Sequence, residues 1–96
     1  MAKKQLKWSI RSQADRLNIT EYYAQEASPF VADAAFSAIK QAAQSIIASP
    51  MAYREGVRPN TREYVMRRFP YTLIYRISGE IVTIVRVMHQ AAKYFN

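Results

Sequence analysis

Several residue types are scarce or missing in this chain of 96 residues, and each absence excludes a class of site. Cysteine is absent, which rules out disulfide bridges, cysteine-ligated zinc and thiol catalysis. The two glycines, Gly56 and Gly79, are too few for a G-x-G-x-x-G dinucleotide fingerprint and too far apart for a phosphate-binding loop or a G-x-S-x-G nucleophile turn. A single histidine, His89, excludes a multi-histidine metal site. We therefore expect neither a metal nor a cofactor.

Long apolar runs are also missing, and residues 1–11 lack the apolar core of a secretory signal. We therefore expect a cytoplasmic protein with no membrane contact. The length predicts a single domain over residues 1–96 that ends in a short tail, residues 90–96. Because half of the residues are hydrophobic and only 22% are charged, we expect a folded core and not disorder.

Charge is the first positive signal. Fourteen basic residues against seven acidic residues give a net charge of +7. The excess lies mainly in residues 49–96, where eight basic and three acidic side chains leave +5; residues 1–48 carry six and four, which leave +2. Seven of those eight basic residues are arginines, whose planar guanidinium groups suit carboxylates and phosphates. The C-terminal half is therefore expected to meet an anionic partner, either a nucleic acid or an acidic protein.

Two helical patterns fill the N-terminal half. Ser12 and Asp15 match the S-x-x-D capping box, which predicts a helix over residues 13–25. Ser28 and Pro29 predict the N-cap and first turn of a second helix, which ends at Ser49-Pro50. Because only two or three residues separate the two segments, they are expected to form an antiparallel hairpin.

Strand patterns dominate the C-terminal half. Four runs rich in Val, Ile, Tyr and Thr or in apolar-polar alternation predict strands, over residues 7–10, 62–69, 71–77 and 81–88. Residues 51–61 predict a loop, and Ser78-Gly79 predicts a two-residue hairpin turn. The predicted fold class is α+β with the order β-α-α-β-β-β, in which an antiparallel helix hairpin packs on a curved, mainly antiparallel four-stranded sheet.

Two arginines, Arg76 and Arg86, interrupt strands that are otherwise apolar. A buried guanidinium without a partner is costly, so each must pair with a carboxylate or face a binding partner. The carboxylates considered for structural pairing are Glu55, Glu63 and Glu80. The predicted turn places Arg76 on the same sheet face as His89, and Arg86 on the opposite face. Structural and functional roles stay open for both arginines.

His89 and Tyr94 are the candidates for proton transfer. His89 directly follows the last strand, where an imidazole can exchange a proton near neutral pH or simply close the sheet through a hydrogen bond. Tyr94 lies in the tail, where it can anchor the tail or act beside His89.

A second basic group ends the first strand after the loop. Arg67 and Arg68 are adjacent, so their side chains are expected on opposite faces of the strand. Together with Arg54, Arg58 and Arg62 they form either a phosphate-binding patch or an ordinary solvated surface. The aromatic residues lack the interleaved pattern of a base-stacking platform.

The last two strands carry a more specific pattern. Residues 69–76 read F-P-Y-T-L-I-Y-R, and residues 84–89 read I-V-R-V-M-H. This pair, following a helix hairpin, resembles the signature of the RelE/ParE superfamily of bacterial toxins. The resemblance covers residues 7–94. It implies the RelE/ParE-like fold and the toxin of a type II toxin–antitoxin pair, with roles in growth inhibition and plasmid stabilisation.

Two mechanisms occur in this superfamily. The ParE branch poisons DNA gyrase and is not a nuclease. The RelE branch cuts mRNA on the ribosome by general acid–base chemistry in a basic cleft. For this chain the RelE-like alternative would use the ribosome and mRNA as partners, and its candidate catalytic residues are His89, Arg76, Arg86 and Tyr94.

The resemblance favours the ParE branch for three reasons. The helix hairpin is long and alanine-rich, no tyrosine directly follows the histidine, and no lysine lies between Lys40 and Lys93. The chain departs from the ParE pattern at Ala92, where many members carry an arginine. A gyrase inhibitor, and not an enzyme, is therefore the expected function. Its candidate target contacts are Arg67, Arg68, Arg76, Arg86, His89 and Lys93.

The resemblance also implies a cognate antitoxin, ParD-like or of another acidic type, whose tail folds on binding and wraps the hairpin and sheet. The candidate antitoxin contacts are large apolar residues of the hairpin: Leu17, Tyr22, Tyr23, Phe30 and Phe36. Each of them also fits simple core packing. A third function, an inactive toxin that only binds antitoxin, stays open beside the other two.

Overall fold

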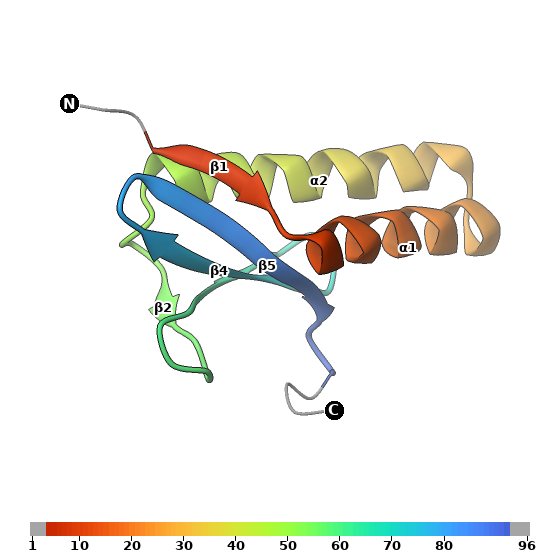
Figure 1. The fold of residues 1–96 in the computed structure, drawn as a ribbon. Helices are drawn as coiled ribbons and strands as arrows, with labels where there is room; N and C mark the ends of the chain where they lie inside the picture. The colour runs from red at the N-terminus through yellow and green to blue at the C-terminus, as the bar shows by residue number, and fades with distance from the viewer. Residues whose placement is uncertain (1–3, 93–96) are drawn as a thin grey trace.

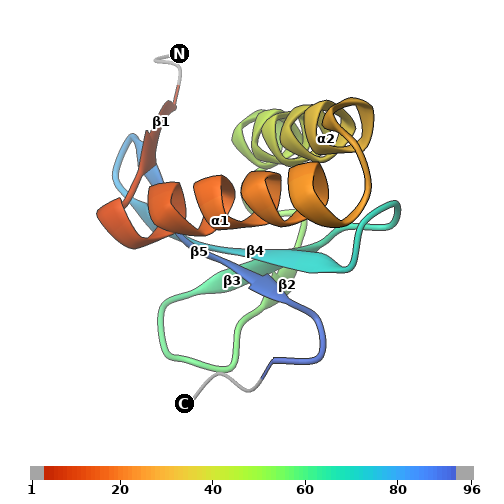
Figure 2. The same cartoon turned by 90° about the vertical axis from the view of Figure 1, so that its right-hand side faces the viewer.

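The computed structural model describes residues 4–92, which form two helices on one face of a five-stranded sheet (Figure 1 and Figure 2). The elements are β1 (Gln5–Trp8), α1 (Ile10–Glu26), α2 (Pro29–Ala48), β2 (Arg54–Glu55), β3 (Arg62–Val65), β4 (Tyr71–Ser78) and β5 (Ile81–His89). The predicted α+β class is confirmed. The predicted strand count is wrong by one, because β2 lies in the segment predicted to be a loop.

The sheet order is β1-β5-β4-β3-β2, with β1 parallel to β5 and the other pairs antiparallel. β2 pairs only Arg54 and Glu55 with β3, and so short a polar strand shows no apolar alternation in the sequence. At the opposite edge β1 ends at Trp8, two residues before the predicted end. Within residues 4–92, no helix is long and apolar enough to cross a membrane.

Helix α1 begins earlier than the capping box predicts. Ser9 is its N-cap, and the Ser9 Oγ accepts a hydrogen bond from the Ser12 N–H at 3.0 Å. Ser12 is buried in the first turn, where its own Oγ donates to the Ser9 carbonyl at 2.9 Å. The predicted box at Ser12 and Asp15 is therefore wrong, because a serine three residues earlier already satisfies the free amide.

Helix α2 has the predicted ends. The Ser28 Oγ accepts from the Val31 N–H at 3.1 Å, Pro29 occupies the first turn, and the helix ends at Ala48, directly before Ser49. The core lies between the helices and the sheet. Its fully buried side chains include Ile39 and Ile46 from α2, Leu73 and Tyr75 from β4, and Val82 and Ile84 from β5. Each such apolar side chain contributes about 1.5–3 kcal/mol through burial.

A β-bulge in β5 decides which side chains share a face. Ile74 pairs with Arg86, while Tyr75 pairs with Ile84, so Val85 has no partner on β4. The extra residue switches the alternation. Arg86 therefore lies on the face of Ile74, away from the helices, whereas His89 pairs with Tyr71 on the helix side.

The predicted faces of Arg86 and His89 are wrong for this reason, because Arg76 shares its face with Ile74 and Arg86 and not with His89. The turn between β4 and β5 also differs by one residue. Ser78 pairs with Ile81, and the two loop residues are Gly79 and Glu80. Gly79 has a φ of 59°, which glycine adopts without steric cost. This shift alone does not change which side chains share a face. It moves the partner of each β4 residue by two positions along β5, and side chains of a strand alternate with a period of two.

Candidate functional site

The candidate site is a pocket of about 450 Å³ on the sheet face that points away from the helices. Its apolar lining comes from Ile10, Val57, Ile74, Val85 and Met88. Its basic lining comes from Arg11, Arg58, Arg76 and Arg86, and Ser9, Thr61 and Glu63 complete it. The pocket therefore combines an apolar surface with guanidinium groups, which suits an anionic partner with apolar parts.

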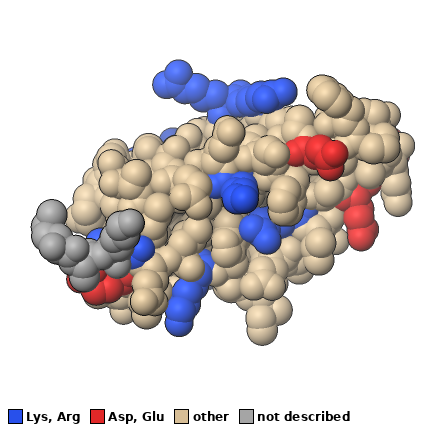
Figure 3. All heavy atoms as spheres, turned by 90° about the horizontal axis from the view of Figure 1, so that it is seen from above, with Lys and Arg blue, Asp and Glu red and all other residues tan. Residues whose placement is uncertain are grey.

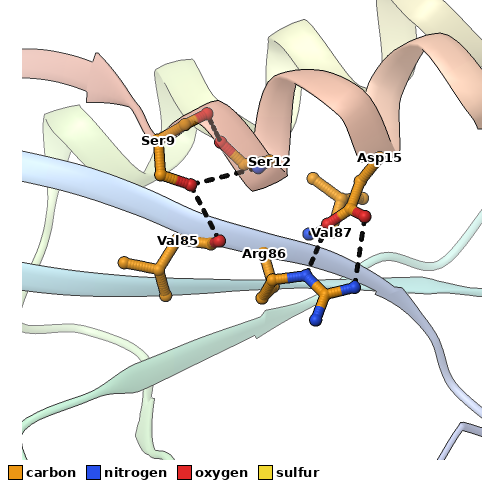
Figure 4. Close-up of polar contacts among 6 residues, drawn as sticks. All are labelled: Ser9, Ser12, Asp15, Val85, Arg86 and Val87. Atoms are coloured by element: carbon orange, nitrogen blue, oxygen red, sulfur yellow. Dashed lines mark hydrogen bonds and ion pairs between the residues drawn. The ribbon is translucent and has the colours of Figure 1, made fainter.

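Arg86 is fixed within this pocket by a carboxylate from α1 (Figure 4). Its Nε donates to Asp15 Oδ2 at 2.8 Å, and its Nη2 donates to Asp15 Oδ1 at 3.2 Å. This hydrogen-bonded pairing raises the pKa of Arg86. The partner is none of the three predicted glutamates, because Arg86 lies at the edge of β5 past the end of β1, where Asp15 of α1 is within reach. Any ligand in the pocket therefore contacts an Arg86 whose charge is already paired with Asp15.

The N-cap and the second turn of α1 also complete the edge of β5 where β1 ends (Figure 4). The Ser9 Oγ donates to the Val85 carbonyl at 2.9 Å, and Asp15 Oδ2 accepts from the Val87 N–H at 2.9 Å. These contacts satisfy backbone groups that a longer β1 would have paired. Asp15 thus has two structural tasks, and the capping interpretation of the sequence missed both.

Arg76 contrasts with Arg86 in the same pocket. Its side chain is exposed, and no carboxylate within residues 4–92 lies within ion-pair distance of it. Glu63, at 3% exposure, pairs instead with Arg54, whose Nη2 lies 2.8 Å from Glu63 Oε1. Glu63 Oε2 is buried and has no hydrogen-bond partner in the described part of the chain. Arg76 is therefore available to meet an anion that enters the pocket.

The predicted five-arginine patch is divided. Arg54 pairs with Glu63, and Arg62 donates to the Tyr53 carbonyl at 2.7 Å, so both hold the β2 edge together. Arg67 and Arg68 are both exposed in the loop between β3 and β4, past the end of the strand. They border a separate groove beside α2. The two target-binding groups predicted from the sequence thus lie in different places.

His89 does not line the arginine pocket. Its ring makes an edge contact with Tyr71 at a centroid distance of 5.5 Å, and its Nδ1 accepts from the Ala91 N–H at 3.0 Å. Burial raises the pKa of Tyr71 above its ordinary value. Tyr94 and Lys93 lie outside the described residues. Of the predicted catalytic set, the structure brings together Arg76 and Arg86 and places His89 on the other sheet face.

The helix hairpin presents most of the predicted antitoxin contacts to solvent. Leu17 is 63% exposed, Tyr22 55%, Phe30 80% and Phe36 42%. Tyr23 differs, because it is half-buried and packs edge-on against Phe69 at 5.4 Å and Tyr71 at 6.4 Å. The face seen from above in Figure 3 is largely uncharged, with scattered basic and acidic side chains. Four of the five residues are therefore available to a partner.

Sequence reasoning missed two features of these surfaces. The Arg16 guanidinium lies 4.0 Å from the centre of the Trp8 ring and 5.5 Å from that of Phe36, and burial lowers the pKa of Arg16. No local pattern marks this contact, because the three residues belong to different elements, β1, α1 and α2. Gln90 makes three hydrogen bonds after β5, but no pattern marks a lone glutamine. Within residues 4–92 no cluster of acidic or histidine side chains is placed to hold a metal ion.

Comparison with known proteins identifies the family. Residues 6–94 match the family model described as the ParE toxin of the type II toxin–antitoxin system parDE. A Sinorhizobium fredii protein with the toxin name Y4kP is 33% identical over 89 residues, which are 93% of this chain and 91% of that protein.

Two solved structures share the fold. A chain of the chromosomal ParDE system from P. aeruginosa matches with a TM-score of 0.83 at 25% identity, covering 91% of this chain and 96% of that one. A chain of the RelBE2 toxin–antitoxin complex from Mycobacterium tuberculosis matches with a TM-score of 0.60 at 22% identity, covering 96% and 97%, and shows the fold alone. The chain belongs to the ParE toxin family of type II toxin–antitoxin systems.

Proposed function

We propose that this toxin inhibits DNA gyrase by binding to it, and that it does not cut RNA. The observation that carries the proposal is the separation of His89 from Arg76 and Arg86 by the bulge at Val85. General acid–base catalysis needs a proton-transfer group within about 3 Å of the reacting atom. Among the described residues that line the arginine pocket, none is a histidine, lysine or tyrosine.

The acidic residue of the pocket does not supply that chemistry either. Glu63 is buried and ion-paired with Arg54, so its carboxylate is held for the sheet edge. The pocket can bind and orient an anionic group through Arg76, with Arg86 held beside it by Asp15. These properties favour a binding inhibitor, which agrees with membership of the ParE family.

A cognate antitoxin is the second proposed partner. The toxin family and the ParDE toxin–antitoxin system named for the similar P. aeruginosa structure support it. The exposed apolar residues Leu17, Tyr22, Phe30 and Phe36 provide anchor positions on the hairpin. The net charge of +7 complements an acidic partner.

Because gyrase acts on chromosomal DNA, the proposal places the toxin in the cytoplasm, with residues 1–96 acting as one domain.

The direct test is a gyrase assay with the purified toxin. Supercoiled plasmid, gyrase and ATP are incubated with the toxin, and cleaved DNA trapped on gyrase is measured after denaturation. We expect trapped cleavage with the unaltered chain and nearly the same amount with His89→Ala. A ribosome-dependent RNase would instead leave gyrase unaffected, cut mRNA in a translation reaction, and lose about 10²-fold or more of that activity with His89→Ala.

A further inference from the structure

Directly after β5, a single glutamine, Gln90, connects the chain to the loop between β3 and β4 through hydrogen bonds. The Gln90 N–H donates to the Pro70 carbonyl at 2.8 Å. Its side-chain Nε2 donates to the Met66 carbonyl at 2.9 Å and to the Tyr71 carbonyl at 3.2 Å. One side-chain amide therefore reaches both ends of the loop that joins β3 to β4. We call this set of three hydrogen bonds the tail clamp.

The loop that the clamp holds carries the exposed pair Arg67 and Arg68. Two backbone hydrogen bonds close it, from the Met66 N–H to the Tyr71 carbonyl at 3.0 Å and from the Tyr71 N–H to the Phe69 carbonyl at 2.8 Å. The Tyr71 carbonyl therefore accepts from both the loop and Gln90. The position of the two arginines relative to the start of the tail is fixed through this shared acceptor.

The two residues after Gln90 are held by hydrogen bonds to His89. The Ala91 N–H donates to His89 Nδ1 at 3.0 Å, and the Ala92 N–H donates to the His89 carbonyl at 2.8 Å. His89 in turn packs against Tyr71, which belongs to β4. Residues 89–92 thus form a turn, and Gln90 within this turn is hydrogen-bonded to the loop between β3 and β4.

We propose that Gln90 is a positioning residue that joins the start of the C-terminal tail and the Arg67–Arg68 loop into one contact surface for the target. Glutamine suits this task because its amide has two N–H donors, and two carbonyl oxygens lie within reach. A glutamate of the same shape has no donor and would face both carbonyls with negative charge. This inference rests on the proposed function for the identity of the target, whereas the order of the tail is testable without gyrase.

The first experiment compares Gln90→Glu with Gln44→Glu in the full-length toxin. Gln44 is exposed on α2 and makes no side-chain hydrogen bond within residues 4–92, so its variant carries the same charge change without touching the clamp. The measurement is the steady-state heteronuclear ¹⁵N NOE of Ala91 and Ala92, together with the amide shifts of residues 66–71.

For Gln90→Glu we expect the NOE of both alanines to fall toward values typical of a free chain end and the loop shifts to move. Gln44→Glu should leave both unchanged. Because Gln90 is exposed, water can replace its hydrogen bonds, and the thermal midpoint should shift by less than about 4 °C. Unchanged NOE values in Gln90→Glu would overturn the proposal. If Gln90→Glu does not fold, Gln90→Ala removes the donors without adding charge and is measured against Gln44→Ala.

The second experiment measures binding to gyrase. We expect Gln90→Ala to weaken binding about fivefold to tenfold, because a surface that is no longer pre-organised must be ordered on binding. Gln44→Ala should bind as the unaltered chain does. Unchanged affinity of Gln90→Ala, together with a loosened tail, would overturn the positioning role. Failure of the unaltered toxin to bind gyrase would contradict the proposed function while leaving the NMR result on the clamp intact.

Discussion

The helix hairpin and the open sheet face differ in what they offer a partner. The hairpin exposes large apolar side chains, among them Leu17 and Phe30. The face seen from above carries scattered basic and acidic groups among uncharged residues (Figure 3). The open sheet face holds an apolar pocket lined with arginines, of which Arg76 has no carboxylate partner among residues 4–92. The comparison indicates two separable contacts, one suited to apolar anchors of an antitoxin and one suited to an anionic group of a target.

The two surfaces are also stabilised differently. The hairpin packs through small side chains, since Ala35 and Ala43 of α2 are fully buried. The open face depends on two ion pairs: Asp15 with Arg86, which joins α1 to β5, and Arg54 with Glu63, which joins the neighbouring strands β2 and β3. Changes to surface apolar residues should therefore alter binding and leave stability unchanged, whereas changes to the paired carboxylates should lower the free energy of unfolding.

The largest expected effect separates the two contacts. We predict that Leu17→Asp combined with Phe30→Asp weakens antitoxin binding by about 10²-fold or more, because each charge replaces an apolar anchor. Inhibition of gyrase should stay unchanged. Calorimetric titration with the cognate antitoxin gives the first quantity, and the cleavage assay gives the second. A control at Gln44→Asp should affect neither, and equal losses of both activities would show that the surfaces are not separable.

The second prediction concerns the ion pair at the edge of the pocket. Asp15→Ala leaves the Arg86 guanidinium and the Val87 N–H without their acceptor. Because these side chains are partly exposed, at 15% for Asp15 and 28% for Arg86, the free energy of unfolding should fall by about 2 kcal/mol and not by the full cost of a buried pair.

Urea denaturation measures this loss, and Asp33→Ala is the matched control. Asp33 is exposed on α2 and forms no ion pair within residues 4–92, so its removal should change stability by less than about 0.5 kcal/mol. Similar losses from the two variants would contradict the proposed structural role of Asp15.

Arg76 gives the third prediction. We expect Arg76→Ala to weaken gyrase binding about tenfold and to leave stability unchanged, because its side chain is exposed and has no carboxylate partner among residues 4–92. Lys40→Ala removes the same charge from the exposed surface of α2 and serves as the control. If both variants lose the same affinity, the effect comes from net charge and not from the pocket.

Helix capping gives the smallest effect. Ser9→Ala should cost about 1 kcal/mol, because it removes the cap of α1 and the hydrogen bond to the Val85 carbonyl. Ser12→Ala should cost about 0.5 kcal/mol or less, since the Ser9 carbonyl also accepts from the Gln13 N–H. Thermal unfolding of the two variants orders them, and the reverse order would favour the cap at Ser12.

The sequence was sufficient for the features that depend on local patterns. The α+β class, the order of all elements other than β2, and the start of α2 at Ser28 and Pro29 were predicted. The cap of α1 was not, because Ser9 and Ser12 are both suitable residues and only the sheet contact at Val85 selects Ser9.

The candidate site was harder to predict than the fold. The residues of β5 are apolar on both faces, so no alternation shows where Val85 is inserted as a bulge. That one residue moves Arg86 to the pocket and His89 to the helix side. Asp15 and Arg86 are 71 positions apart, and only the folded chain brings them together. Long-range pairing of this kind leaves no local pattern.

The most direct test of gyrase inhibition is pulse-labelling of DNA and protein synthesis in bacteria immediately after this chain is induced without antitoxin. We predict that DNA synthesis stops first, with filamentation and a DNA-damage response, and that His89→Ala leaves this order unchanged. If protein synthesis stops first and mRNAs are cut within codons, gyrase inhibition is contradicted and the RelE-like mechanism applies.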